Sequence, residues 1–282
     1  MKRGQRDPIL PRRGAGGRPR PRAGGDRVGA DARPAHPDKG VDFGHPTRPP
    51  SAATLPLRGR DAAAALAADR AKALQLTPVS RETAERLDRF VGLLLERQRG
   101  TNLIAASTVG NLWTRHIADS LQLVSLAPKA RSWVDVGSGA GFPGLIIACA
   151  LAGTRAAVHL VESNGKKAAF LRAAQLLTEA PAVVHQERME ELVRHLPASV
   201  DAVCARAVSP LKSLLRLCYP LLGKTAAVGL FPKGQNAELE LHEAAKIWNM
   251  DAMLVPSRTD PAGRIIVVRD VSPQGRIYNY NS

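Results

Sequence analysis

Hydrophobic and polar positions divide the chain into three stretches with different patterns. Residues 1–60 show no hydrophobic period, whereas from residue 61 the spacing of Ala and Leu is helical. We predict helices from residue 61, from near Ser80 and around Trp113–Leu126, which together form a helical cap over residues 61–130. One face of the second helix is apolar and carries Leu87, Phe90, Val91, Leu94 and Leu95. Such a face requires a partner surface.

The second half of the chain alternates between short apolar runs and helical patterns. We predict strands at 132–136, 157–162, 182–185, 202–205 and 226–231. Helical patterns lie between and after them, at Leu145–Leu151, Lys167–Leu177, Met189–His195, Leu211–Leu222 and Ala237–Trp248. This alternation indicates a parallel sheet covered on both faces. Closing strands near 252–255 and 264–269 complete a seven-stranded, mostly parallel α/β domain over residues 131–272, followed by a tail at 273–282.

The N-terminal stretch is basic and rich in Pro and Gly. Residues 1–60 hold 14 Lys or Arg against 5 Asp or Glu, with 10 Gly and 10 Pro, in a chain whose formal net charge is +15. We predict that this tail is disordered, because it cannot bury enough apolar surface to offset the entropy of ordering. A basic chain is drawn to polyanions. Both an RNA-tethering arm and a dispensable extension fit the tail.

Three cysteines, Cys149, Cys204 and Cys218, sit in apolar runs without C-x-x-C spacing, which favours reduced, buried thiols and a cytoplasmic location. No apolar run approaches the roughly 20 residues of a membrane span, and the N-terminus has no signal-peptide pattern. The histidines show no metal-ligand spacing, so we expect no metal.

A glycine-dense turn follows the first predicted strand and contains Gly137, Gly139 and Gly141. Glycines let the backbone approach a ligand closely, and the proline that follows suits the start of a helix. In a dinucleotide fingerprint the third glycine would fall on Phe142, which weakens a nicotinamide interpretation. Glu162 closes the second strand, where an acidic side chain can accept hydrogen bonds from ribose hydroxyls.

The turn reads VDVGSGAGFPGLIIA, and its G-x-G-x-G spacing resembles the first motif of S-adenosylmethionine methyltransferases. With Asn102-Leu103, the segment 115–120, the segment 204–207 and the segment 232–235 in this order, the chain resembles the 16S ribosomal RNA guanine-N7 methyltransferases, the glucose-inhibited division protein B family. The resemblance covers roughly residues 75–270. It implies the class I S-adenosylmethionine-dependent methyltransferase fold, which is Rossmann-like.

The resemblance also implies a reaction and its partners. The cofactor would be S-adenosyl-L-methionine, and the acceptor would be N7 of a guanosine in 16S rRNA, guanosine 527 in the standard rRNA numbering. The expected partner is 16S rRNA within the 30S subunit, and the expected oligomeric state is a monomer. By position, Gly137 and Phe142 would line the methionine and ribose part of the site. Met189 and Glu190 would flank the adenine, and Arg206 would lie beside the cofactor.

Arg115 and His116 are candidates either for RNA contact or for bracing the cap, and Lys233, at the end of the fifth strand, is a candidate for contact with an RNA phosphate near the pocket. One segment departs from the family pattern. The family usually has a tryptophan and an asparagine shortly before the Asn-Leu pair, where this chain has residues 96–101, Glu-Arg-Gln-Arg-Gly-Thr.

No catalytic base is expected, because N7 of guanine already directs a lone pair outward and alignment can supply much of the rate. The segment 205–210 lacks the Asn/Asp-Pro-Pro-aromatic motif of exocyclic-amine methyltransferases, and Cys204 is interpreted as a core thiol. Two alternatives stay open at this point. They are a non-catalytic RNA-binding or ribosome-assembly protein that kept the cofactor fold, and an NAD(P)-dependent oxidoreductase.

Overall fold

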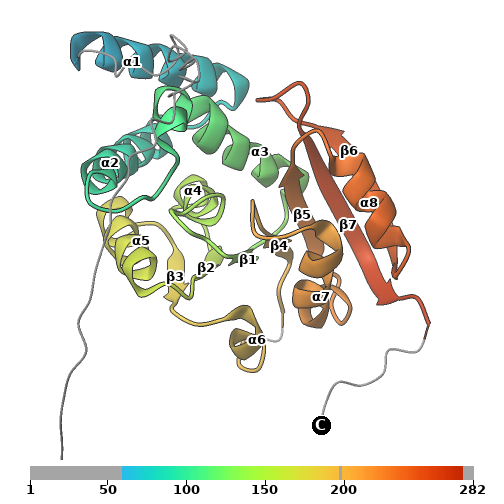
Figure 1. Cartoon of the computed structure of the whole chain (residues 1–282). Helices are drawn as coiled ribbons and strands as arrows, with labels where there is room; N and C mark the ends of the chain where they lie inside the picture. Colours follow the sequence, from blue (N-terminus) through green and yellow to red (C-terminus); the bar gives the residue numbers. More distant parts are fainter. Residues whose placement is uncertain (1–58, 197–198, 276–282) are drawn as a thin grey trace, which may run out of the picture. The chain divides into compact units, whose positions relative to one another are not determined.

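The computed structural model describes residues 59–196 and 199–275 (Figure 1). The basic tail, except for its last two residues, and most of the C-terminal tail therefore lie outside the described residues. These described residues belong to one compact unit. Within the described ranges, no helix combines the length and the apolar character needed to cross a membrane.

A seven-stranded sheet with the order β3-β2-β1-β4-β5-β7-β6 runs through the domain. The first five strands in this order are parallel, and β7 is antiparallel to both β5 and β6. This confirms the seven-stranded, mostly parallel sheet of the class I methyltransferase fold. The strands are β1 (Ser132–Val136), β2 (Ala157–Val161), β3 (Ala182–His185), β4 (Ala202–Cys204), β5 (Val228–Lys233), β6 (Trp248–Pro256) and β7 (Arg264–Pro273).

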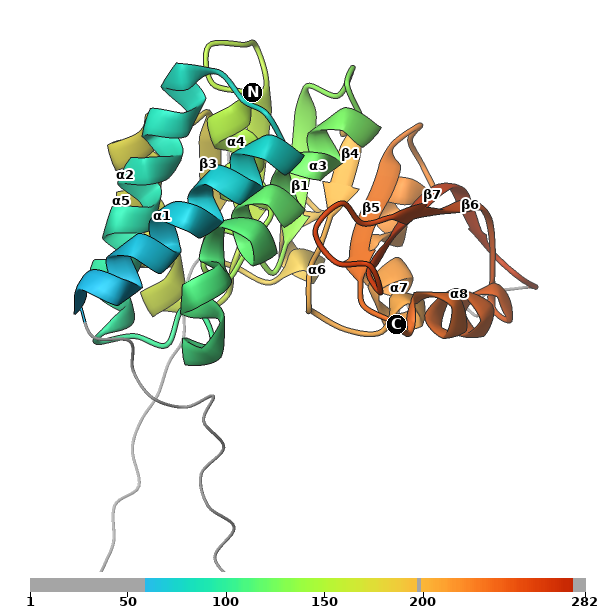
Figure 2. The same ribbon diagram turned by 90° about the horizontal axis from the view of Figure 1, so that it is seen from above.

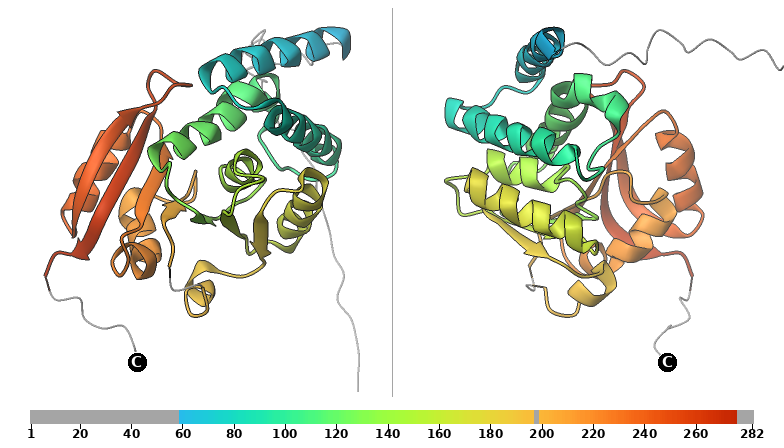
Figure 3. Two further views of the ribbon diagram at one scale, coloured as in Figure 1. Left: turned by 180° about the vertical axis from the view of Figure 1, so that it is seen from behind. Right: turned by 60° about the vertical axis from the view of Figure 1, so that its left-hand side comes forward.

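Helices cover both faces of the sheet, as Figures 1 and 3 show. They are α1 (Gly59–Leu76), α2 (Arg81–Gln98), η2 (Ala106–Asn111), η3 (Trp113–Ala118), α3 (Asp119–Leu126), α4 (Gly144–Ala150), α5 (Gly165–Thr178), α6 (Met189–Leu192), α7 (Leu211–Leu222) and α8 (Ala237–Ala245). Successive side chains of β1 point to opposite faces of the sheet, and each face has its own apolar core. Trp133 joins the apolar cluster under α2, α4 and α5, whereas Val134 and Val136 join the cluster under α6 and α7.

The helices ahead of β1 share the first of these two cores. Phe90 and Leu94 of α2 and Ile117 of η3 are fully buried in the same cluster as Trp133. Figure 2 shows α1 on the outside of this layer, where it contacts η3 and η2. The start of α2 is capped as its sequence predicts, because Ser80 Oγ accepts a hydrogen bond from the Thr83 N–H at 3.2 Å.

Some predicted boundaries were wrong, and tertiary contacts explain them. The helix expected to reach Trp248 ends at Ala245, and Trp248 instead begins β6 opposite Pro273 of β7. The Trp248 ring is buried against Tyr219 at 5.4 Å, and its Nε1–H donates to the Lys212 carbonyl. The helix predicted at 113–126 begins with the wider turns of η3 before it becomes α3.

Gln98 belongs to the segment 96–101, which departs from the family pattern, and its side chain makes three hydrogen bonds. Its Oε1 accepts hydrogen bonds from the N–H groups of Leu103 and Ile104, each at 3.0 Å, and its Nε2–H donates to the Ile104 carbonyl at 2.7 Å. One amide side chain therefore joins the end of α2 to the Asn-Leu segment.

Candidate functional site

The glycine turn lies at the carboxyl end of β1, where the strand order reverses between β2 and β4. Ligands of open α/β sheets bind at this kind of switch point. Gly137, Gly139 and Gly141 have φ values of +71°, +55° and +97°, a region that disfavours other residues. The Ser138 N–H donates to the Val161 carbonyl at 2.9 Å, which joins the turn to β2.

Glu162 follows β2 and is 8% exposed, so it is not a solvated surface glutamate. Its Oε2 accepts a hydrogen bond from the Gly139 N–H at 2.9 Å, and its Oε1 accepts one from the Asn164 N–H at 2.7 Å. A carboxylate offers about four acceptor positions, so each oxygen keeps one for a ligand hydroxyl. Glu162 both shapes the turn and can hold a ribose.

The turn leaves its backbone bare at Gly139. A Cβ built there would meet only the Gly137 carbonyl, at 3.8 Å, whereas one built on Gly137 would lie 2.8 Å from the Val208 side chain. Open backbone beside a carboxylate fits a nucleoside that lies against the turn. These residues therefore fit S-adenosylmethionine.

Asp135 supports the turn from below and was not predicted as a site residue. It is completely buried, and its Oδ2 accepts a hydrogen bond from the Gly144 N–H, the start of α4, at 2.9 Å. Burial raises the pKa of Asp135 to about 6. The signal in the sequence was a single acid inside an apolar strand, two residues before the first glycine of the turn.

Phe142 connects the turn to the cap. Its ring is 5% exposed and stacks on the His116 imidazole, with ring centres 4.9 Å apart. The Arg206 guanidinium lies over the ring at 5.1 Å from its centre, and Phe90 of α2 approaches edge-on at 5.5 Å. Residues from the turn, the cap and the end of β4 thus meet at one ring.

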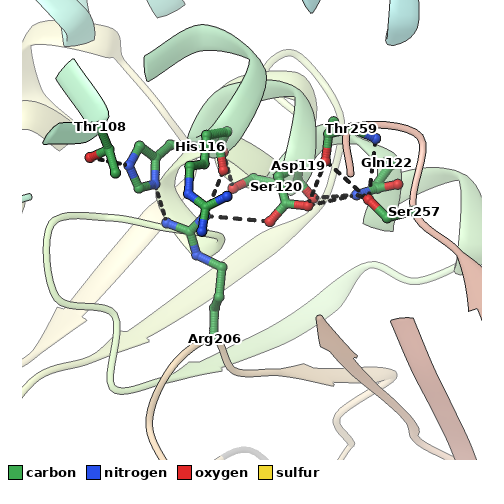
Figure 4. Close-up of polar contacts among 9 residues, drawn as sticks. Thr108, His116, Asp119, Ser120, Gln122, Arg206, Ser257 and Thr259 are labelled. Atoms are coloured by element: carbon green, nitrogen blue, oxygen red, sulfur yellow. Dashed lines mark hydrogen bonds and ion pairs between the residues drawn. The ribbon is translucent and has the colours of Figure 1, made fainter. Parts of the chain in front are cut away.

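Arg206 is held by the cap through three hydrogen bonds (Figure 4). Its Nη1 donates to the Arg115 carbonyl at 3.0 Å and to Asp119 Oδ2 at 3.4 Å, and its Nη2 donates to His116 Nδ1 at 2.7 Å. Since Nδ1 accepts, the hydrogen of the neutral His116 ring is on Nε2, which lies 3.0 Å from Thr108 Oγ1. Burial and the charges of Arg206 and Arg115 lower the pKa of His116 to about 3.

Asp119 extends this network to the loop between β6 and β7 (Figure 4). Its Oδ1 accepts hydrogen bonds from Thr259 Oγ1 at 3.0 Å and from Gln122 Nε2 at 2.9 Å. Gln122 Oε1 in turn accepts one from the Arg258 N–H at 2.9 Å. Asp119 and Gln122 of α3 therefore join Arg206 to the far wall of the site, although neither was predicted from the sequence.

A cleft of about 870 Å³ opens beside this network, and the largely buried Arg206 is one of the residues that line it. Its walls come from α1, η2, η3, the loop after β4, the end of β5 and the β6–β7 loop. Lys233 lines the cleft but has internal partners: its Nζ donates to the Ser209 carbonyl at 2.8 Å and forms an ion pair with Glu240 at 2.8 Å. Arg115 is exposed at the rim.

Met189 and Glu190 begin α6, after β3, at the same edge of the sheet as the turn. Met189 is 3% exposed and packs in the core under α6 and α7, whereas Glu190 is exposed. Neither lines the cleft. A flanking role toward adenine stays a prediction for both.

Cys204 is a fully buried thiol, as the apolar pattern around it predicts. Burial and the neighbouring Asp135 raise its pKa well above the ordinary value, which suppresses the reactive thiolate. His159 and His185 pair with each other in the sheet, with Nδ1 and Nε2 2.9 Å apart.

Comparison with known proteins assigns the chain to a family. Residues 83–260 match the family model GidB, described as rRNA small subunit methyltransferase G. This chain belongs to that family. It is 54% identical to the Ribosomal RNA small subunit methyltransferase G of Bradyrhizobium sp. (strain BTAi1), over 72% of this chain and 91% of that protein. It is 50% identical to the one from Nitrobacter hamburgensis, over 83% of this chain and 90% of that protein.

The match to the GidB family includes the turn, Glu162, Arg206 and the first part of the loop after β6, but not α1. Family membership confirms the resemblance and removes the oxidoreductase alternative. A solved O-methyltransferase from Bacillus cereus in complex with SAH is 13% identical and aligns with 74% of this chain and 99% of that one, at a TM-score of 0.46. The fold itself is established by the strand order of this chain.

Proposed function

We propose that this chain transfers a methyl group from S-adenosylmethionine to N7 of a guanosine in 16S rRNA, as its GidB relatives are named for small-subunit rRNA methylation. The proposed target is guanosine 527 in the standard rRNA numbering. We also propose that the enzyme acts as a cytoplasmic monomer and that its substrate is the assembled 30S subunit.

One observation supports N7 in particular. The titratable side chains closest to Arg206 are committed to internal hydrogen bonds, since His116 is neutral with both nitrogens engaged and Asp119 bonds to Arg206, Gln122 and Thr259. Such groups are poor proton acceptors for a substrate. Guanine N7 presents its lone pair without losing a proton, so it suits this site.

The cofactor supplies an electrophilic methyl group on sulfur when it is bound. The bare backbone at Gly139 and the carboxylate of Glu162 would hold its nucleoside part. Arg206, fixed in position by the cap, would orient the base that enters from the cleft. Holding both reactants in line lowers the barrier by reducing the entropy lost in the transition state.

The test is methyl transfer from radiolabelled S-adenosylmethionine to 30S subunits from cells that lack the gene, followed by mapping of N7-methylguanosine. We expect label at one guanosine of 16S rRNA. Tight cofactor binding without transfer to 30S subunits or to free 16S rRNA would instead support the non-catalytic assembly protein. Label on another atom or on another RNA would contradict the proposed acceptor.

A further inference from the structure

Apart from Arg264, whose Nη1 donates to the Pro261 and Gly263 carbonyls, the lysines and arginines that line the cleft fall into two groups. Arg206 and Lys233 are 18% and 10% exposed and form ion pairs with Asp119 and Glu240. Lys72 and Arg115 also line the cleft, but both are exposed, and neither enters any ion pair or side-chain hydrogen bond within residues 59–196 and 199–275. The inner cations are neutralised by the protein, whereas the rim cations are available to a partner.

Lys72 reaches the cleft because α1 is fastened to η3. Asp69 of α1 accepts hydrogen bonds from the Trp113 N–H at 2.7 Å and from Thr114 Oγ1 at 2.5 Å. Residues three apart on a helix share a face, so Lys72 lies on the side of α1 that faces η3. Arg115 directly follows Thr114 in η3, and both cations line the cleft where α1 and η3 form its wall.

Within the part of the chain that the structure describes, each carboxylate that lines the cleft has a partner. Asp119 and Glu240 form the ion pairs above, and Asp260 accepts a hydrogen bond from the Ala262 N–H at 3.0 Å. Asp69 is 9% exposed, and both of its oxygens accept hydrogen bonds from residues 113 and 114. The nearby Asp88 already binds Arg70 of α1 through both oxygens, at 2.7 Å each. Arg70 itself also lies over the Trp113 ring. Its guanidinium is therefore already engaged within the protein, unlike the ammonium group of Lys72.

We propose that Lys72 and Arg115 form a phosphate-binding pair that holds the RNA strand at the rim of the cleft, beside the nucleotide to be methylated. This inference rests on the proposed function, because it assumes an RNA substrate. Exposed cations release counterions when they bind phosphate, whereas cations already paired inside the protein contribute little to that release. The RNA interface then extends onto α1, outside the residues that match the GidB family.

The experiment measures binding of the full-length chain to 30S subunits from cells that lack the gene, across a range of salt concentrations. Lys72→Ala and Arg115→Ala should each reduce the slope of log K against log salt by about 0.7–0.9 and weaken binding about fivefold near 0.1 M salt. Lys72→Arg should keep the slope. In the methylation assay, KM for the subunit should rise while kcat and KM for S-adenosylmethionine stay unchanged.

Lys129→Ala is the matched control, because it removes one exposed lysine just before β1, at the opposite edge of the sheet. The proposal is overturned if the rim variants bind like Lys129→Ala, or if they lower kcat without changing the salt slope. Wild-type protein that binds subunits but transfers no methyl group would overturn the proposed function alone, since the salt slope would still report on the rim pair.

Discussion

The glycine turn and the cleft lie side by side but are built in different ways. In the turn, the bonds that hold the shape join residues 9 and 23 positions apart, namely Gly144 to Asp135 and Gly139 to Glu162. In the cleft, Arg206 bonds to His116 across 90 positions, and Asp119 bonds to Thr259 across 140. The turn is a property of one βαβ unit, whereas the cleft exists only after the cap and the β6–β7 loop have docked.

Because of this difference, substitutions in the turn and substitutions in the cleft should have different effects. Changes in the turn act on close packing of backbone and should affect folding of the whole domain. Changes in the cleft act on a polar network at the surface of that domain, so they should affect the reaction more than the fold. Each of the following variants tests one side of this comparison.

The largest effect is expected for Gly144→Ala. A Cβ at this position would lie 2.5 Å from both the Asp135 Cβ and the Leu160 side chain. Overpacking of this kind should lower the free energy of unfolding by about 3 kcal/mol, measured by urea denaturation. Gly92→Ala in α2 is the control, since nothing lies within 4 Å of its Cβ and it should stabilise by about 0.5–1 kcal/mol. Equal effects of the two variants would contradict the tight packing below the turn.

Arg206→Lys should lower kcat/KM for 30S methylation by roughly 30-fold while the fold is retained. Lysine keeps the charge beside Asp119 but cannot reach His116 and the Arg115 carbonyl together, and charged hydrogen bonds contribute about 1.5–3 kcal/mol each. Arg81→Lys, at an exposed pair on α2, should leave the rate unchanged. Full activity of Arg206→Lys would show that the fixed guanidinium is not needed.

His116 should make the protein less stable in acid. The pKa of His116 is about 3 in the folded chain, against 6.5 for an ordinary histidine, so below pH 6.5 the unfolded chain takes up a proton that the folded chain does not. Stability should therefore fall by about 1–2 kcal/mol between pH 6.5 and 5, since one pKa unit corresponds to 1.36 kcal/mol and solvent screening reduces the effect. His116→Gln should flatten this part of the curve of unfolding free energy against pH. An unchanged curve would mean that the ring is protonated in the folded state.

Asp135 should act in the opposite direction. Its pKa is about 6 in the folded chain against an ordinary 3.8, so the folded chain takes up this proton first as pH falls, and stability should rise between about pH 6 and 4. Asp135→Asn keeps an acceptor for the Gly144 N–H and should remove about 1–2 kcal/mol of this dependence. The measurement is again the unfolding free energy as a function of pH. A steeper rise in the variant would show that Asp135 is ionised below pH 4.

Thr259→Val should have the smallest effect. It removes the hydroxyl that bonds to Asp119 and Ser257, each at 3.0 Å, at the edge of the network. We expect a loss of about 1 kcal/mol of unfolding free energy and a smaller change in kcat/KM than for Arg206→Lys. A double-mutant cycle with Asp119→Asn should show that the two losses are not additive. Additive losses would mean that the loop docks independently of Asp119.

Some of this site could be predicted because its physical causes lie close together in the chain. The run of glycines after an apolar strand predicted the turn, and the acid at the end of the next strand predicted Glu162. Asp119, Gln122 and Lys72 were not predicted, because a polar residue on an amphipathic helix looks the same whether it faces water or a partner far along the chain. For the same reason His116 and Lys233 were candidates for RNA contact, although both have internal partners in the structure.

The sequence by itself determined the order of the strands and helices along the chain, the bend at Gly137–Gly144 and the acid that faces it. The reason is that the alternation of apolar and polar residues, glycine and proline all act on their immediate neighbours in the chain. Only the tertiary structure decided where the cap docks, that Trp248 begins a strand, and which cations of the cleft are paired and which are exposed. Whether a charged side chain is paired depends on which groups the folded chain brings within about 4 Å of it. Those groups can lie far away in the sequence, so the residues around the charge do not reveal them.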